Sequence, residues 1–160
     1  MSNTIQLAVR TLVEHVYSSG SIDSRFRSQS TMLEGTRIHQ KIQLTYQESD
    51  QKEVYLRADF PVKDLIFSID GRCDGLLFRN GEVIIDEIKS TSQYLEHLGD
   101  DGLPVHWAQA KMYAYIYAKD QHLQEIFVQL TYVQAESEEK RLLKKCFSIA
   151  ALEGFDQEVV

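Results

Sequence analysis

The stretch that decides the fold reads Phe67-Ser-Ile-Asp-Gly-Arg-Cys-Asp-Gly-Leu-Leu-Phe-Arg-Asn-Gly-Glu-Val-Ile-Ile-Asp-Glu-Ile-Lys89. Its two apolar runs flank Asn80-Gly81, a pair that predicts a tight β-hairpin turn because both residues accept a positive φ. Side chains alternate faces along a strand, so Glu87 and Lys89 share one face of the second strand. The hairpin is therefore expected to bring Asp74 close to Glu87 and Lys89.

Two carboxylates and an amine at one spot suit the hydrolysis of a phosphodiester. Hard cations such as Mg²⁺ bind one or two carboxylates and keep several waters, which leaves room for a phosphate oxygen and an attacking water. An adjacent lysine polarises the phosphate or orients that water. In the alternative interpretation, Asp74 and Glu87 sit at exposed strand ends and Lys89 pairs with one of them. An acid-x-Lys tripeptide alone favours this second interpretation.

Two further patterns flank the hairpin. Gly35-Thr-Arg-Ile-His39 lies in a predicted helix before it, and Gln109-Ala-Lys-Met-Tyr113 lies in another after it. With Gly71 to Asp74 and Glu87 to Lys89, they form the ordered set G-x-x-x-H, G-x-x-D, (D/E)-x-K and Q-x-x-x-Y. In this set the chain resembles the RecB-like branch of the PD-(D/E)XK nucleases. The set spans residues 35 to 113, about half of the chain.

The resemblance implies a metal site and a catalytic lysine. His39, Asp74 and Glu87 would bind Mg²⁺ or Mn²⁺. The main-chain oxygen of Ile88 would be a further ligand, and Lys89 would act in catalysis. The resemblance also implies a restriction-endonuclease-like (PD-(D/E)XK) core around these residues.

The same resemblance assigns roles outside the metal shell. Gln109 and Tyr113 would face the site from their helix, order it and touch the nucleic-acid backbone. Several relatives hold an iron-sulphur cluster on four cysteines. This chain has only Cys73 and Cys146, so a cluster of that type is excluded. Cys73 also stands where other branches of the superfamily have proline.

The fold class predicted is α/β, with a mixed central β-sheet of about five strands flanked by helices. Periodicity and breakers predict the element order α-α-β-β-β-α-β-β-α. The helices are expected over residues 5–16, 31–44, 104–119 and from 148 onward. Besides the hairpin, the strands are expected over residues 53–60, where Pro61 ends the pairing, 125–133 and 140–148.

Two polar segments are expected to be loops. Residues 18–30 carry Arg25 and Arg27 around Phe26 and could form an arch near the site, although a solvated loop is the default interpretation. Residues 90–103 border the proposed site, so substrate would enter there.

Composition bounds the rest. The 160 residues are 43% hydrophobic, which fits one nuclease domain over residues 1–160. Two distant cysteines and the lack of an apolar run of about 20 residues predict a cytoplasmic protein without a membrane span. The net charge of −7 argues against a broad phosphate-binding surface. Local DNA binding, or affinity borrowed from a linked partner, is therefore expected.

The end of the sequence suggests where such a partner would be joined. Lys140, Arg141, Lys144 and Lys145 form a basic cluster, which is most simply a solvated face but could contact DNA or a partner domain. The chain then stops inside an amphipathic segment. We therefore expect a domain excised from a longer helicase or recombination protein.

The function predicted is a Mg²⁺- or Mn²⁺-dependent deoxyribonuclease acting on single-stranded DNA or DNA ends. The alternative is a catalytically inactive, nuclease-derived module that binds DNA or protein. The intact set Asp74, Glu87 and Lys89 speaks against this alternative, because a binding module does not need all three.

Overall fold

The computed structural model describes residues 3–17 and 29–159. Six strands form one mixed sheet in the order β1-β3-β4-β5-β6, with β2 paired on β3. β1 runs parallel to β3 and β4 parallel to β5, while the other pairs are antiparallel. The strands are β1 (Asn3–Ala8), β2 (Gln51–Val62), β3 (Leu65–Arg79), β4 (Glu82–Thr91), β5 (Glu125–Gln134) and β6 (Lys140–Ser148).

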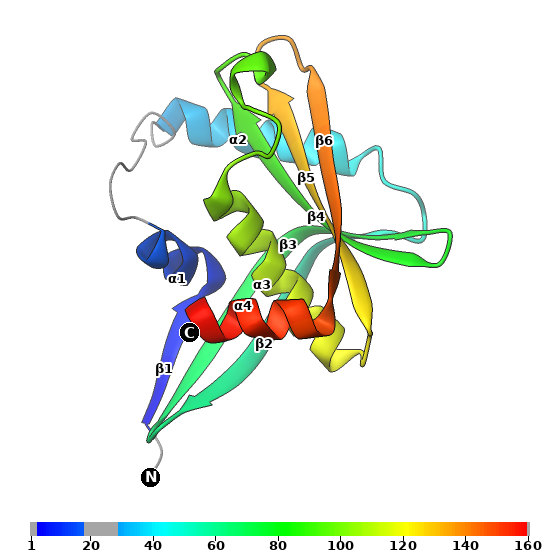
Figure 1. Cartoon of the computed structure of the whole chain (residues 1–160). Helices are drawn as coiled ribbons and strands as arrows, with labels where there is room; N and C mark the ends of the chain where they lie inside the picture. Colours follow the sequence, from blue (N-terminus) through cyan, green and yellow to red (C-terminus); the bar gives the residue numbers. More distant parts are fainter. Residues whose placement is uncertain (1–2, 18–28, 160) are drawn as a thin grey trace.

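The helices cover both faces of this sheet. One face carries α1 (Val9–Val16), α3 (Pro104–Asp120) and α4 (Ile149–Val159), while α2 (Gln29–Gln43) crosses the other (Figure 1). A short 3₁₀ helix, η2 (Leu95–His97), precedes α3. The α/β class and the mixed sheet flanked by helices are confirmed. The predicted loop with Arg25 and Arg27 falls largely on residues 18–28, outside the described residues.

Strand β3 is shared between two neighbours along one edge. Its first half, Leu65–Asp70, pairs with β1, and its second half, Gly75–Arg79, pairs with β4. Strand β2 follows the opposite edge over most of this length. Residues 71–74 therefore lie at a fork, where β3 passes from one partner to the other and the sheet opens. Asp74 is the last residue of this fork.

The helix predicted over residues 5–16 was wrong in its first half. Residues up to Ala8 form β1, and only Val9–Val16 are helical. Ile5 and Leu7 alternate with polar residues, so they fit a strand as well as a helix, and parallel pairing with β3 decides between the two. The sheet consequently has one strand more than expected.

The hairpin turn was predicted correctly. Asn80 and Gly81 have φ values of 52° and 81°, as a two-residue hairpin turn requires. Pro61, in contrast, does not end the pairing of β2, which continues to Val62 opposite Leu65. Proline is tolerated there because β2 lies at the edge of the sheet, where the missing N–H breaks no ladder bond.

The main core lies between the sheet and the three helices α1, α3 and α4. Helix α3 begins with Pro104 in its first turn, as predicted, and most of its residues are buried. Helix α4 buries Leu152, Phe155 and Val159 and contacts α3 and α1, so the apolar stripe near the end of the sequence packs on this domain. No helix of the described residues is long and apolar enough to cross a membrane.

Candidate active site

Two acids meet where β3 and β4 part. The last rung of their ladder joins Gly75 to Asp86, so Asp74 and Glu87 occupy the next position on each strand. Both are buried, with 8% of Asp74 and 3% of Glu87 exposed. The structure therefore places the two predicted acids at adjacent positions at the fork of the sheet, near enough for the charge of Asp74 to act on Glu87.

Asp74 is held by helix α2 and by the neighbouring strand β4. His39, on α2, places Nδ1 3.1 Å from Asp74 Oδ1. The backbone N–H of Ile88 donates to Asp74 Oδ2 over 2.8 Å. The N–H and C=O of a strand residue point toward the same edge, so the main-chain oxygen of Ile88 faces the same opening. His39, Asp74 and Ile88, three predicted ligands, thus gather at one place.

A buried glutamine fixes the backbone of Asp74. Gln43, in the last turn of α2, donates through Nε2 to Asp74 O and to Glu53 Oε1, each at 2.9 Å. The β2–β3 ladder skips the rung between Glu53 and Asp74, and Glu53 has a positive φ of 53°. Side-chain bonds thus replace the ladder beside the site. Gln43 was missed from the sequence, where a glutamine ending a helix carries no signal of this role.

Lys89 lies between Glu87 and Gln109. Its Nζ is 3.2 Å from Glu87 Oε1 and 2.9 Å from Gln109 Oε1. Gln109 also forms a hydrogen bond with the Tyr113 hydroxyl. The predicted order of strand, lysine and helix is therefore present, with Gln109 joining Lys89 to Tyr113.

The glycines of two motifs sit where a side chain would not fit easily. A Cβ on Gly71 would lie 2.6 Å from the Tyr113 hydroxyl, closer than side-chain carbons approach other atoms. A Cβ on Gly35 would lie 3.3 Å from Ser90 Oγ, which is also tight. Gly71 lets α3 approach the fork, and Gly35 lets α2 approach the end of β4. All four sequence motifs thus contact one another in space.

The electrostatics of the site favour a cation. Burial and the charge of Asp74 raise the pKa of Glu87 to about 7, although Lys89 and His39 act against this rise. Burial lowers the pKa of His39, but the hydrogen bond and charge of Asp74, with Glu87, outweigh it and leave that pKa raised. Among the described residues, Glu87 Oε2 is a buried oxygen without a hydrogen-bond partner. An additional positive charge at this point would satisfy it.

The donor set fits a hard divalent cation in kind. Carboxylate and carbonyl oxygens with one imidazole suit Mg²⁺ or Mn²⁺. The side chains do not, however, form a preorganised metal site. In the part of the chain that the structure describes, no three His, Cys, Asp or Glu residues form a group that could hold a metal. Binding through His39 Nδ1 would require this nitrogen to give up any proton that it shares with Asp74, because a metal-bound imidazole nitrogen carries none.

Asp86 belongs to a separate network on the opposite face of β4. Its carboxylate accepts hydrogen bonds from Tyr46 and Thr131, both at 2.6 Å, and from Gln129 at 3.2 Å. With 1% of its surface exposed, Asp86 is buried and fully bonded. It therefore stabilises the sheet beneath α2, and Glu87 is the acid of this pair that faces the candidate site.

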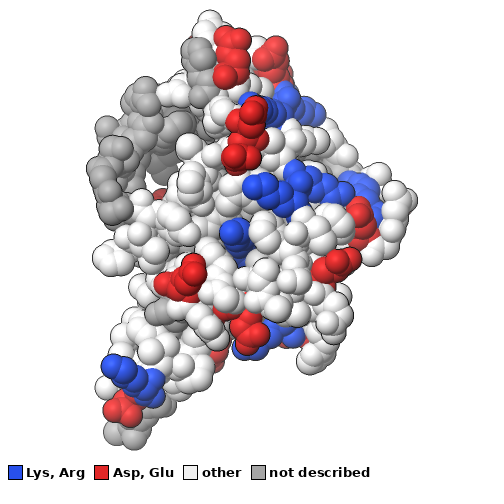
Figure 2. Space-filling model, in the orientation of Figure 1, with Lys and Arg blue, Asp and Glu red and all other residues white. Residues whose placement is uncertain are grey.

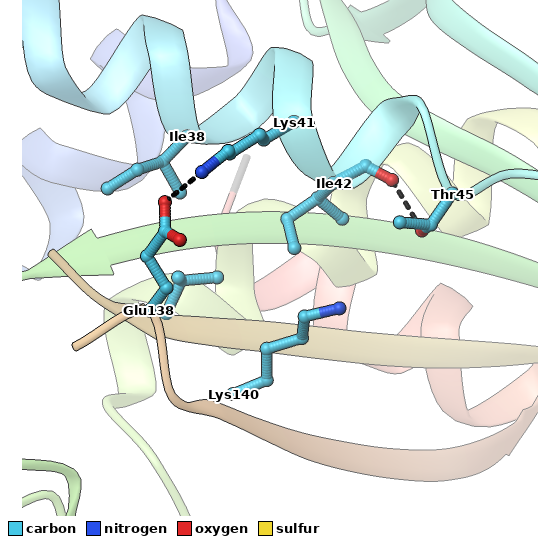
Figure 3. Close-up of a pocket in the computed structure, with 7 residues that line it drawn as sticks. Ile38, Lys41, Ile42, Thr45, Glu138 and Lys140 are labelled. Carbon is cyan, nitrogen blue, oxygen red and sulfur yellow. Dashed lines mark hydrogen bonds and ion pairs between the residues drawn. The ribbon is translucent and has the colours of Figure 1, made fainter.

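A hollow of about 270 Å³ lies under α2 but away from these acids. Ile38 and Ile42 of α2 line it together with Val133 of β5. Lys41 of α2 pairs with Glu138 at its edge (Figure 3). Val133 follows Tyr132 on the strand and so points to the face opposite the one that carries Lys89. The hollow thus belongs to the small apolar cluster beneath α2.

The basic residues of β6 do not form one surface. Lys145 stacks over Trp107 on the α3 side, while Lys144 pairs with Glu82 and lies over Phe127 on the other face. Figure 2 shows a band of basic side chains that crosses the α3 side of the molecule, with acidic residues around it. Alternation along the strand therefore divides the predicted cluster between two faces.

The segment 90–103 is more ordered than its composition indicated. Its first residues end β4, and Leu95 in η2 is buried. Arg141 donates to Leu95 O and to Asp100 Oδ1, each at 3.3 Å. The segment is thus fastened to β6 beside the site, and the prediction that it is only a polar loop was incomplete.

Comparison with known proteins supports the fold alone. No protein-family model matches the sequence, and no curated protein matches it. The structure is similar to the crystal structure of SSO0001, with a TM-score of 0.53 and 22% sequence identity. That similarity covers 99% of this chain and 76% of the other. At this identity it supports a shared architecture and carries no statement about activity.

Proposed function

We propose that the protein is a metal-dependent nuclease that hydrolyses phosphodiester bonds of DNA, in single strands or at ends. The observation that carries this proposal is the meeting of Asp74, Glu87 and Lys89 at the fork of the sheet. Within the described residues, the buried Glu87 Oε2 lacks a partner, which is unfavourable unless a cation or a proton joins it. The ordered motifs of the RecB-like nucleases agree with this assignment.

In this proposal, one group of residues would bind the metal ion and Lys89 would contact the phosphate. Asp74, Glu87, His39 and the main-chain oxygen of Ile88 would hold Mg²⁺ or Mn²⁺. Such an ion, when bound, polarises a phosphate oxygen and lowers the pKa of water. Lys89 would place its ammonium at the phosphate, where charge develops during hydrolysis.

The remaining residues would keep these groups in place. Gln109 accepts a hydrogen bond from Lys89 Nζ and so fixes the direction of the amine. Tyr113 orders Gln109 in turn. In the proposed complex, both residues would lie along the nucleic-acid backbone. Because binding residues on regular elements are positioned more accurately than on loops, this arrangement suits a chemical step.

The proposal extends to the setting of the domain. A net charge of −7 and divided basic residues leave little surface for tight DNA binding. We therefore propose that a covalently linked helicase or other DNA-binding domain supplies most of the affinity, in the cytoplasm. An iron-sulphur cluster is not part of the proposal.

One observation favours the alternative, an inactive module that binds DNA or protein. Both carboxylate oxygens of Asp74 already have a hydrogen-bond partner. Oδ2 accepts from the Ile88 N–H, and Oδ1 is bonded to His39 Nδ1. A protein that had lost its metal could keep this closed arrangement. Cleavage and metal binding separate the two candidates.

The test is a cleavage assay on end-labelled single-stranded, duplex and flapped DNA with Mg²⁺ or Mn²⁺. We expect cleavage that chelation stops and that Ca²⁺ supports poorly. Lys89→Ala should abolish cleavage and leave Mn²⁺ binding intact, whereas Glu87→Gln should weaken both. Lys144→Ala and Glu82→Gln, which break an exposed ion pair, are matched controls. Cleavage by pure protein in excess chelator would rule out the metal site.

A further inference from the structure

Helix α3 presents three polar residues to the sheet in one row. His106, Gln109 and Tyr113 stand at positions i, i+3 and i+7, so they share one face of the helix. Two neighbouring strands meet this row. Lys89 of β4 contacts Gln109 at 2.9 Å, and Tyr132 of β5 contacts His106 at 2.8 Å.

These two contacts between α3 and the sheet lie side by side. Lys89 and Tyr132 are partners in the parallel ladder between β4 and β5. His106 therefore stands beside Gln109, one strand further along the sheet. Lys89 is near enough that its positive charge acts on the imidazole of His106. The site thus extends beyond the predicted residues to a histidine that no motif included.

The hydroxyl of Tyr132 favours one of the two tautomers of His106. Tyr132 is 1% exposed, and its oxygen accepts the N–H of Leu103 over 3.1 Å. It has one proton to donate, and His106 Nδ1 lies 2.8 Å away. If the hydroxyl donates to Nδ1, the Leu103 N–H and the Tyr132 O–H both have an acceptor. The neutral imidazole then carries its own proton on Nε2, which is directed away from Tyr132.

We propose that His106 is a further substrate-contacting residue, whose Nε2–H donates a hydrogen bond to a phosphate oxygen of the nucleic acid held beside Lys89. This inference rests on the proposed nuclease function. Lys89 and His106 come from neighbouring contacts of α3 with the sheet, and an ammonium and a neutral N–H can both donate to phosphate oxygens. Burial, with the charges of Lys89 and Arg10, lowers the pKa of His106 to about 3, so the ring is a neutral donor at physiological pH.

The competing explanation is that His106 only packs against Tyr132 and secures Leu103. In that role, Nε2 of His106 would make no contact with substrate, and its NMR signal would not change when substrate binds. It would also allow the opposite tautomer, with Nδ1–H donating to Tyr132. Both points can be measured on the unaltered protein, so the test does not depend on the folding of a variant.

The first experiment is NMR of the wild-type chain with labelled histidines. Long-range proton–nitrogen spectra report which ring nitrogen is protonated. We expect His106 to stay in the Nε2–H form without titrating between about pH 5 and 8. A short oligothymidylate added with Ca²⁺ should shift the Nε2–H signal. A proton on Nδ1, or an oligonucleotide that binds without moving this signal, would overturn the inference.

The second experiment measures steady-state cleavage. His106→Ala should lower kcat/KM by about 10- to 100-fold, as expected for a lost hydrogen bond to a charged group. The exposed His122, with a φ of 58° that asparagine tolerates, provides the control His122→Asn, which should cleave as the wild type. If His106→Ala cleaved with the same kcat/KM as the wild type, this inference would be wrong, but the proposed nuclease function would be unaffected. If the wild type neither bound nor cleaved DNA, the proposed function itself would fail.

Discussion

Gly71 lies directly against the hydroxyl of Tyr113, at a distance that leaves no room for a methyl group. A Cβ there would be 2.6 Å from the hydroxyl oxygen and 3.0 Å from the ring carbon Cε1. Tyr113 is 3% exposed and is hydrogen-bonded to Gln109, which holds Lys89. A single glycine at the fork is thereby connected to the position of the proposed catalytic amine.

Gly71→Ala should therefore disturb both stability and cleavage. We expect overpacking to lower the free energy of unfolding by about 1–3 kcal/mol and displacement of Gln109 to lower kcat. Thermal melting and cleavage assays measure the two effects. Gly154→Ala, in an open position of α4, is the control and should stabilise by about 0.5–1 kcal/mol. Adding Tyr113→Phe to Gly71→Ala should recover part of the lost stability. An unaffected Gly71→Ala variant would contradict the tight contact.

Gln43→Leu should weaken the proposed metal site without replacing a proposed ligand. The change removes the donor to Asp74 O and leaves that buried oxygen unpaired, at a cost of about 1–3 kcal/mol. We expect Mn²⁺ affinity, measured by calorimetry, to fall by about 10- to 100-fold, as for other groups that orient ligands. Gln40→Leu, on an exposed position of the same helix, is the control. Equal Mn²⁺ affinity in the two variants would refute the positioning role of Gln43.

Glu87→Gln should stabilise the metal-free protein at alkaline pH. The pKa of Glu87 is raised from 4.5 to about 7, so between these values the folded state holds more protons than the unfolded state. Wild-type stability should then fall as pH rises through this window, because the charged form is disfavoured by burial. Glutamine is neutral throughout and avoids this fall.

Melting temperatures in chelator and in Mn²⁺ test this expectation. In chelator, the variant should melt above the wild type near pH 8, and the difference should shrink toward about pH 5. Mn²⁺ should raise the melting temperature of the wild type and have little effect on the variant. A variant that melts lower at every pH would mean that the contact with Lys89 outweighs the burial of the charge.

The two faces of β6 should contribute unequally to DNA binding. Arg141 and Lys145 share the face that carries Lys89, whereas Lys140 and Lys144 point to the other. We expect the double change of Arg141 and Lys145 to alanine to weaken oligonucleotide binding and to reduce the salt slope by up to about 2. The matching change of Lys140 and Lys144 should have little effect. Fluorescence anisotropy at several salt concentrations measures both. Equal losses would mean that DNA follows the edge of the sheet.

The parts of the fold that the sequence predicted are those decided locally. The turn at Asn80 and Gly81 depends on two adjacent residues, and their conformational freedom predicted the hairpin with Asp74 and Glu87. The helix over α3 was predicted from Pro104 and an apolar run. In these cases neighbours along the chain supply the deciding interactions.

The missed features depend on partners that are distant in sequence. β1 forms because β3 offers an edge to Asn3–Ala8, not because those residues exclude a helix. Gln43 matters only because Asp74 turns its carbonyl toward α2. His106 is distinguished by Tyr132, a residue of another strand. Such roles become visible when the tertiary contacts are known.

The fork in β3 also has a consequence for the order in which the chain folds. β2, β3 and β4 follow one another through two-residue turns, so their pairing closes only short loops, whereas Asn3 must find Leu65 across a long intervening chain. We expect Asp74 and Glu87 to meet early, in a three-stranded meander, and β1 to join late. Pulse-labelling hydrogen exchange during refolding should protect the amides of β3 and β4 before those of β1. In that partly folded intermediate the two acids would repel each other, because α2 and α3, which carry His39 and Gln109, would not yet have packed around them.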